Sequence, residues 1–329
     1  ITDTHNDLMF LLGRSHGIPY GSNNIVQWVS FPMTLSIDKT LRKAQNHIKA
    51  GELAEAEELY KQVLSSFPKN KKAIQGYQKL KAGITSKGSS SSAPPQEQVD
   101  ELVGLYNQRQ FEEVLAKIKP MVGLFPKAIN LHNIQGASNA ALQRYDAAID
   151  SYNQAIKIKP DYAKAYSNMG IALNEKGELD AAIESCKRAI KIKPDYADAY
   201  NNMGNALKDK GELDAAIDSY KQAIKIKPDY ADAYNNMGNA LNEKGELDAA
   251  IESYKHAIKI NPDYAEAFNN MGNSLRDKGE LDAAIDGYKQ ALKIKPDFAE
   301  AYNNMGIALK KMGKLNVAID SYKQALKIK

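Results

Sequence analysis

Cysteine, histidine and tryptophan are scarce in this chain of 329 residues, which has one cysteine, five histidines and one tryptophan. A single thiol cannot form a disulfide within the chain, and it cannot build a zinc site that needs several cysteine ligands. The longest apolar run near the start, Leu8–Leu12, is far shorter than the roughly 20 residues that span a membrane. These shortages exclude a disulfide-stabilised domain and a cysteine-built metal centre, and they predict no membrane partner.

The charges are nearly balanced, with 44 basic against 40 acidic residues and a formal net charge of +4. Nucleic-acid-binding chains carry a clear basic excess, so this balance predicts no nucleic acid partner. The stretch 69–96 is an exception, because it contains six lysines and no acidic residue. Tyr77 is its only aromatic residue, so we interpret the lysines as a helix face in contact with solvent.

Residues 1–36 show no helical period, and we interpret them as an N-terminal extension of unknown structure. The chain opens at Ile1 and not at a methionine, so its natural start is open, and Met33 is one candidate for it. Alternatively, the β-prone run Ile25–Val29 belongs to an arm that docks onto a neighbouring molecule. No basic segment precedes the first apolar run, so we expect no signal peptide and favour a cytoplasmic location.

A repeat of 34 residues dominates the rest of the sequence. The prolines that mark it are Pro126, Pro160, Pro194, Pro228, Pro262 and Pro296. Residues 197–230 and 231–264 differ at five positions only, which are 208, 209, 218, 222 and 227 of the first segment. Near-identity at a fixed period is typical of repeat proteins, in which each repeat is one small structural unit.

The pattern within one repeat predicts two helices. The apolar residues at i, i+3, i+4 and i+7 of the first are Tyr200, Met203, Gly204 and Leu207. The same spacing continues from Leu213 to Ile224, and Gly211 between them can adopt the left-handed conformation of a tight turn. Asp195 stands where an N-cap residue is expected for the first helix. Neither helix can bury its stripe alone, so the hairpins must stack on one another.

These residues resemble the tetratricopeptide repeat, whose period is 34 residues. The matching positions in one unit are Tyr200, Met203, Gly204, Leu207, Ala216, Tyr220 and Pro228. The resemblance implies an all-α fold, a right-handed α-solenoid whose first helices line the concave surface of a superhelix. It also implies a protein–protein interaction scaffold with a protein or peptide partner.

In this register the chain divides into the extension 1–36 and three further parts. A degenerate hairpin and one helix cover residues 37–82, a Ser- and Pro-rich linker covers 83–96, and the array covers 97–329. The units of the array lie near 95–128, 129–162, 163–196, 197–230, 231–264, 265–298 and 299–329.

Asparagines recur on the side of the first helices that lies opposite the apolar stripe. One row consists of Asn168, Asn202, Asn236, Asn270 and Asn304, and a shorter row consists of Asn205, Asn239 and Asn273. A carboxamide offers one acceptor and two donors, which complement the C=O and N–H groups of a peptide backbone. The first row is similar to the asparagine ladder of O-linked N-acetylglucosamine transferase, which grips the backbone of its substrates. We therefore predict that these residues bind extended peptide segments.

Isoleucines interrupt the rows at Ile134, Ile171 and Ile307, so we expect the ladder to span only the centre of the array. The rows also have a simpler explanation, because a solvated asparagine is copied with its unit when a repeat duplicates. The chaperone-tail clamp of this family needs lysine beside the asparagine. The corresponding positions hold Asn201, Asn235, Asn269 and Asn303, so we do not expect that activity.

Groups that could carry catalysis are few. Asp3–Asp7 resembles the metal-binding strand of zinc dipeptidases, but the surrounding αβ barrel that would complete such a site is not predicted. No phosphate-binding loop or nucleophile elbow is present. Cys186 stands where most units have tyrosine, so we expect a buried residue and not a nucleophile. We predict no enzyme activity, no metal and no cofactor.

Two other functions fit the same repeat. The array resembles the targeting arm of a larger glycosyl- or sulfotransferase whose catalytic domain would follow Lys329. Alternatively, the final helix, Leu315–Ile328, exposes an apolar stripe that could stack on the first unit of another copy. Such head-to-tail contacts would produce a filament, with the chain as its own partner.

Overall fold

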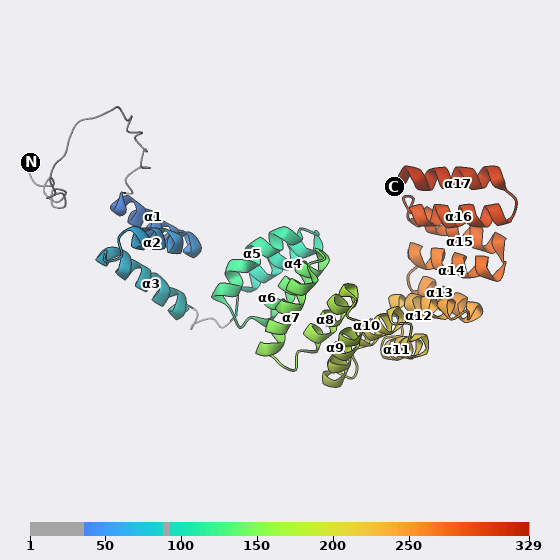
Figure 1. Cartoon of the computed structure of the whole chain (residues 1–329), viewed down its shortest axis with the longest axis horizontal. Coiled ribbons are helices and arrows are strands. Elements are labelled where there is room, and N and C mark those ends of the chain that lie inside the picture. The colour runs from blue at the N-terminus through green and yellow to red at the C-terminus, as the bar shows by residue number, and fades with distance from the viewer. Residues whose placement is uncertain (1–35, 88–92, 329) are drawn as a thin grey trace, which may run out of the picture. The chain divides into compact units, whose positions relative to one another are not determined.

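The computed structural model describes residues 36–87 and 93–328, and the regular structure in these ranges is entirely helical (Figure 1). The first helices along the chain are α1 (Ile37–Ala50), α2 (Leu53–Ser66) and α3 (Lys71–Lys87). The remaining helices are α4 (Gln96–Asn107), α5 (Phe111–Leu124), α6 (Ile129–Ala141), α7 (Tyr145–Ile158), α8 (Ala163–Lys176), α9 (Leu179–Ile192), α10 (Ala197–Asp209), α11 (Leu213–Ile226), α12 (Ala231–Glu243), α13 (Leu247–Ile260), α14 (Ala265–Lys278), α15 (Leu281–Ile294), α16 (Ala299–Lys311) and α17 (Leu315–Ile328).

The chain divides into two compact units, with the boundary between Leu80 and Lys81. In the first unit α1 and α2 form a hairpin, and the buried ring of Tyr60 lies against Gly76 of α3. Helix α3 extends through Lys87, into the range 83–96 that the sequence suggested was linker. One glycine inside a helix costs only about 1 kcal/mol, so Gly83 does not end α3, and the Ser- and Pro-rich residues come after it.

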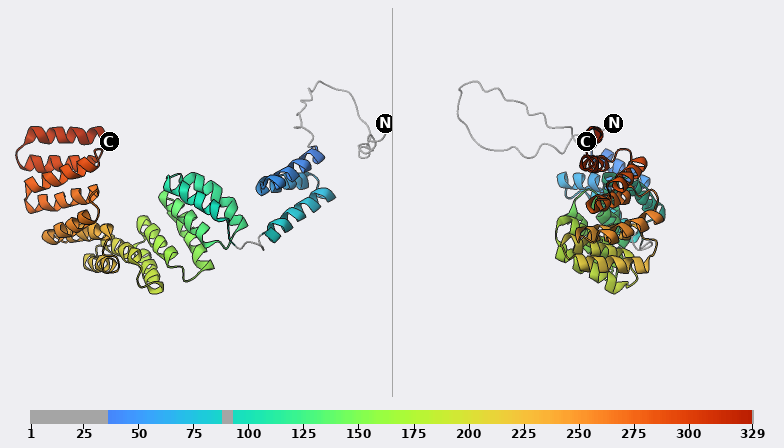
Figure 2. Two further views of the ribbon diagram at one scale, coloured as in Figure 1. Left: turned by 180° about the vertical axis from the view of Figure 1, so that it is seen from behind. Right: turned by 90° about the vertical axis from the view of Figure 1, so that its right-hand side faces the viewer.

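In the second unit the helices pair as the repeat predicts, from α4 with α5 to α16 with α17, and Figure 2 shows the hairpins following one another in chain order. The first helix of each hairpin packs on both helices of the preceding one. First helices therefore contact each other from hairpin to hairpin, whereas the second helices of the described array share no comparable contact. This asymmetry makes the side of the first helices the concave side of an all-α solenoid.

A tyrosine packed on a glycine joins the two helices of most hairpins in the array. Tyr220 of α11 is buried, and its ring covers Gly204 of α10 so closely that a Cβ there would lie 2.5 Å from the ring. The same pair recurs as Gly238 with Tyr254 and as Gly272 with Tyr288. Glycine at this position therefore lets the two helices of a hairpin approach closely.

The turn inside each hairpin needs a left-handed residue. Gly211 has φ +85° and closes α10, as the sequence predicts, and glycines one period away have the same conformation. In the two N-terminal hairpins of the array this position holds Arg109 with φ 60° and Gln143 with φ 59°. A side chain in this region is strained, by roughly 1–2 kcal/mol per residue.

We expect Arg109→Gly and Gln143→Gly each to raise the free energy of unfolding by about 1 kcal/mol, because glycine removes the strain at some cost in unfolded-state entropy. Urea unfolding followed by circular dichroism measures the change. The reverse substitution, Gly245→Ala at φ +84°, should destabilise by a similar amount. Unchanged midpoints for the two glycine variants would contradict the expectation.

The helix starts differ from the prediction, since Asp195 is not the N-cap of α10. Tyr196 occupies that position, without a side-chain capping bond, and α10 begins at Ala197. The equivalent N-cap residues are Tyr162, Tyr230, Tyr264 and Phe298. Their rings are half-buried, and lysines lie over several of them, as Lys193 Nζ does 5.0 Å from the Tyr196 ring centre. Ring burial between hairpins therefore outweighs side-chain capping at this position.

Helix α17 exposes apolar side chains. Ile319 is 49% exposed, whereas Ile285 at the same position of α15 is 6% exposed because the next first helix covers it. Leu315, Val317 and Leu326 are exposed as well. The apolar stripe expected on this helix is present among the described residues, and head-to-tail stacking of copies stays a prediction.

Candidate functional site

The asparagine ladder lies on the concave side of the array, on the first helices α8, α10, α12, α14 and α16. Four members of the longer row are half-buried, and Asn304 is 8% exposed. They lie where one first helix meets the preceding one, because each makes a hydrogen bond to a residue 35 positions earlier. The structure thus brings all five of these predicted residues into one repeating environment.

The hydrogen bonds of the longer row join successive units. In each of them the Nδ2 group of the ladder asparagine donates to an oxygen on the preceding first helix. The pairs are Asn168 to Asn133 Oδ1 (3.0 Å), Asn202 to Ser167 Oγ (3.0 Å), Asn236 to Asn201 Oδ1 (3.1 Å), Asn270 to Asn235 Oδ1 (3.1 Å) and Asn304 to Asn269 Oδ1 (3.0 Å). The row therefore stabilises the stacking of units, a role that the sequence reasoning missed.

The acceptors form a row of their own. Asn201, Asn235 and Asn269 are buried, whereas Asn303, which receives no such bond among the described residues, is exposed. A buried carboxamide without a partner costs roughly 1–3 kcal/mol, which explains why the donor and acceptor recur together. The sequence signal for this contact is the adjacent pair Asn-Asn in the central repeats. The second asparagine of each pair donates to the first asparagine of the pair in the preceding repeat, which lies 35 positions earlier.

The shorter row faces the tyrosines of its own units. The Tyr220 hydroxyl donates to Asn205 Oδ1 at 2.8 Å, and the same bond joins Tyr254 to Asn239 at 2.8 Å. In the next unit Tyr288 donates to Asn273 at 2.9 Å. Burial raises the pKa of Tyr220, so its hydroxyl stays protonated and remains a donor.

These bonds leave different groups of the two rows unused. An asparagine of the longer row donates one N–H to its neighbour, so its Oδ1 and second N–H remain for a ligand. An asparagine of the shorter row accepts through Oδ1, so its NH₂ group remains. The concave surface therefore presents acceptors along the longer row and donors along the shorter one.

Charged side chains flank the ladder at both ends of the first helices. At the helix starts the row runs Lys164, Asp198, Asp232, Glu266 and Glu300. Near the helix ends it runs Glu175, Asp209, Glu243 and Asp277. Burial alone would raise the pKa of Asp209, but hydrogen bonds from Lys208 and Asn174 lower it below its ordinary value, so the carboxylate stays ionised. The second row ends at Lys311 in α16, so both rows are acidic in the central first helices α10, α12 and α14.

Two groups were candidates for catalysis in the sequence, the segment Asp3–Asp7 and the thiol of Cys186. Asp3–Asp7 lies outside the described residues, and within residues 36–87 and 93–328 no group of His, Cys, Asp and Glu side chains is placed to hold a metal ion. Cys186 is fully buried against Gly170, and burial raises the pKa of its thiol to about 12. A thiol in this environment is not a nucleophile at neutral pH, in agreement with its expected packing role.

None of the helices in the described part of the chain is both long and apolar enough to cross a membrane. In the lysine-rich stretch 69–96, Lys72 Nζ lies 3.6 Å from Asp38 Oδ1. Lys69 and Lys79 are exposed, which agrees with a solvated face.

Comparisons with known proteins give one family. The TPR repeat model matches residues 138–177, 171–211, 204–242, 238–275 and 272–313, and tetratricopeptide repeat models match 299–329 and 41–70. No curated protein matches the chain. These matched ranges leave out the hairpin of α4 and α5, which the structure also contains.

Several solved structures are similar to this chain, and the Cut9–Hcn1 structure, whose TM-score exceeds 0.5, supports the same fold. The structure of MamA is 32% identical, with 49% of this chain and 94% of that one covered and a TM-score of 0.45. The Cut9–Hcn1 hetero-tetramer of the APC/C is 17% identical, with 89% and 53% covered and a TM-score of 0.59. YrrB, a TPR protein with an unusual peptide-binding site, is 23% identical, with 55% and 93% covered and a TM-score of 0.44. Because the family models match more than half of its residues, the chain belongs to the tetratricopeptide repeat family.

Proposed function

We propose that this chain is a non-catalytic scaffold that holds an extended segment of a partner protein on its concave surface. Tetratricopeptide repeats mediate protein–protein interactions, so family membership supports an interaction scaffold. The observation that carries the finer proposal is the pair of asparagine rows, which present unused acceptors on one side and unused donors on the other. An extended backbone offers the matching N–H and C=O groups along its length.

The charge of the surface favours neutral or basic segments. The rows at both ends of the central first helices are acidic, which disfavours an acidic partner and attracts a basic one. Five to eight amide hydrogen bonds at about 1 kcal/mol net each, less the cost of ordering the segment, give a dissociation constant on the order of micromolar to millimolar. Backbone contacts alone also give little selectivity among partners.

The same asparagines stabilise the array, so a simple replacement of the ladder would weaken both binding and fold. Asn236 and Asn270 donate to Asn201 and Asn235, and loss of either member removes the same bond. Only the donors, however, present unused groups on the concave surface, because the acceptors are buried. A matched pair of variants therefore separates the two roles.

We expect Asn236→Ala/Asn270→Ala to weaken peptide binding at least about tenfold, because two pairs of ligand contacts are lost. Asn201→Ala/Asn235→Ala removes the same two internal bonds and should change affinity less than about threefold. The probe is a fluorescein-labelled peptide of alternating serine and lysine, titrated by fluorescence anisotropy, with circular dichroism to verify the fold. Equal losses in the two variants, or none, would overturn the proposal.

A further inference from the structure

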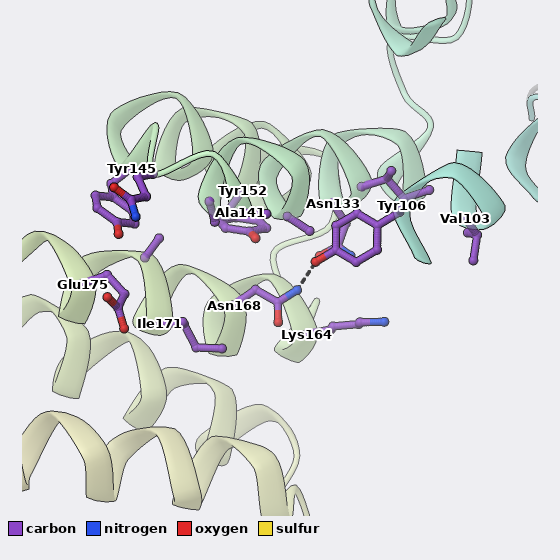
Figure 3. A pocket seen from close by; sticks show the side chains of 15 residues that line it. Val103, Tyr106, Asn133, Ala141, Tyr145, Tyr152, Lys164, Asn168, Ile171 and Glu175 are labelled. Atoms are coloured by element: carbon purple, nitrogen blue, oxygen red, sulfur yellow. Dashed lines mark hydrogen bonds between the residues drawn. The ribbon is translucent and has the colours of Figure 1, made fainter. Parts of the chain in front are cut away.

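The concave surface is not uniform, because it contains an apolar pocket of about 590 Å³ at its N-terminal end (Figure 3). The pocket lies between three first helices. Val103 and Tyr106 of α4 form one side, and Ala137 of α6 and Ile171 of α8 form the other. Val103 and Ile171 are 42% and 43% exposed, so the apolar surface is accessible. Its volume is within the range of ligand pockets in proteins.

The pocket occurs where the ladder lacks asparagines. Ile134 stands at the position of the longer row, and Ala137 and Ile171 stand at the position that Asn205 holds in the shorter row. At these three positions the amide groups of α10, α12 and α14 are replaced by small or apolar side chains, whereas Asn133 and Asn168 still line the pocket. The interruption that limits the ladder creates a site of different chemistry.

Tyr152 contributes a polar group to the pocket. Its side chain is 2% exposed and lines the pocket wall, as Figure 3 shows. Tyr220 donates its hydroxyl to Asn205, but in the unit of Tyr152 that position is Ala137, and the hydroxyl has no hydrogen bond to any described residue. The hydroxyl is therefore free to bond to water or to a ligand that enters the pocket.

Lys164 gives the pocket a charge that the rest of the surface lacks. It lines the pocket at the start of α8, whereas the equivalent residues of α10, α12, α14 and α16 are acidic. Glu175, eleven residues later on α8, also lines the pocket, so the positive charge belongs to the Lys164 end only. Within the described part of the chain Lys164 makes no ion pair, so its ammonium group is available to a ligand carboxylate. Asn168, the first residue of the ladder, lines the same pocket, so a segment held by the ladder passes over it.

We propose that this pocket receives one large aliphatic or aromatic side chain of the bound segment, with an acidic residue of the segment next to it at Lys164. The proposal rests on the proposed function, and it adds the selectivity that a backbone ladder cannot provide. The partner is thus an extended segment with an acidic and apolar end over α4 to α8. Its remaining residues, over α10 to α16, are neutral or basic.

The test compares two labelled peptides on the full chain by fluorescence anisotropy. The probe peptides share a host of alternating serine and lysine, and one carries Leu-Asp at one end where the other carries Ser-Ser. We expect the Leu-Asp peptide to bind about tenfold more tightly or better, because a buried leucine side chain is worth at least that factor. Equal affinities would overturn the proposal.

The variant Ile171→Asn restores the residue of the central units and should abolish the difference between the two peptides. Ile307→Asn, the same change in α16, should leave the difference intact. Both positions are at least partly exposed, so both variants are expected to fold, which circular dichroism verifies. A preference for Leu-Asp that survives Ile171→Asn would place the apolar side chain elsewhere and overturn the proposal.

The ladder variants separate this proposal from the proposed function. Asn236→Ala/Asn270→Ala should lower the affinity for both peptides by the same factor, so that the ratio of the two affinities stays unchanged. If Ile171→Asn removes the preference but the ladder variants bind normally, the pocket is real and the ladder is not the binding surface. If only the ladder variants weaken binding, the pocket proposal fails and the ladder stands.

Discussion

Replacing Tyr254 by alanine is expected to lower the free energy of unfolding by about 3–5 kcal/mol, as for other buried aromatic side chains cut back to alanine. The ring is 1% exposed and fills the space between α12 and α13, where Gly238 leaves no Cβ to occupy it. The substitution also leaves Asn239 Oδ1 without its hydroxyl partner. Urea unfolding measures the global loss, and hydrogen exchange of α12 and α13 locates it.

Two phenylalanine variants divide this effect into packing and hydrogen bonding. Tyr254→Phe removes only the bond to Asn239 and should cost about 1 kcal/mol. Tyr152→Phe removes a hydroxyl that has no described partner, so its cost should be near zero. Equal losses for these two variants would show that the bond to the shorter ladder row contributes nothing to stability.

The hairpins could be predicted from the sequence because their signals are local. Apolar spacing defines the helices, and Gly211 marks the turn by a conformation that few other residues adopt. The stacking of hairpins followed from the same pattern, since neither helix can bury its stripe alone. The period of 34 residues then placed α4 to α17, including the degenerate hairpin of α4 and α5.

Contacts between units were harder to predict, because they depend on the angle at which units stack. Asn236 and Asn201 are 35 positions apart, and nothing in the period itself indicates which side chain of one unit reaches the next. The N-cap was mispredicted for the same reason, because Tyr196 is half-buried at the junction of two hairpins. Local capping rules do not include that neighbour.

The pocket was also hard to predict from the sequence, because it depends on contacts between units. Ile134 and Ile171 were visible in the sequence as gaps in the ladder, but a gap becomes a pocket only when α4, α6 and α8 lie side by side. Val103 comes from a degenerate unit whose register is the least certain from pattern alone. Three units contribute to one site, so no single repeat contains its signal.

The asparagine ladder illustrates how a repeat protein can use one residue twice. The N–H group that joins Asn236 to Asn201 fixes the orientation of the carboxamide, which aims the remaining groups at the concave surface. A ligand group that is already oriented loses less freedom on binding than a mobile one. Stacking of units and presentation of the binding groups are therefore coupled through the same side chain.

Gly238→Ala should also destabilise the array, although alanine is the better helix former. The added Cβ would lie 2.6 Å from Cε1 of Tyr254, and that ring is buried between two helices and cannot move aside. Overpacking of this kind costs about 1–3 kcal/mol after the helices adjust, which exceeds the gain in helix propensity of about 1 kcal/mol at most. We therefore expect a lower urea midpoint and faster hydrogen exchange in α12 and α13.

Gly104→Ala makes the same chemical change inside α4, but it is expected to raise the free energy of unfolding and not to lower it. A Cβ at Gly104 has no described atom within 4 Å, so only the propensity gain remains, and the free energy of unfolding should rise by about 0.5–1 kcal/mol. Stabilisation by both variants would mean that the ring of Tyr254 yields easily, and the tyrosine-on-glycine contact could then not be what fixes the spacing of the two helices. Opposite signs would establish that the contact, and not helix propensity, determines the choice of glycine in the units that pair it with tyrosine.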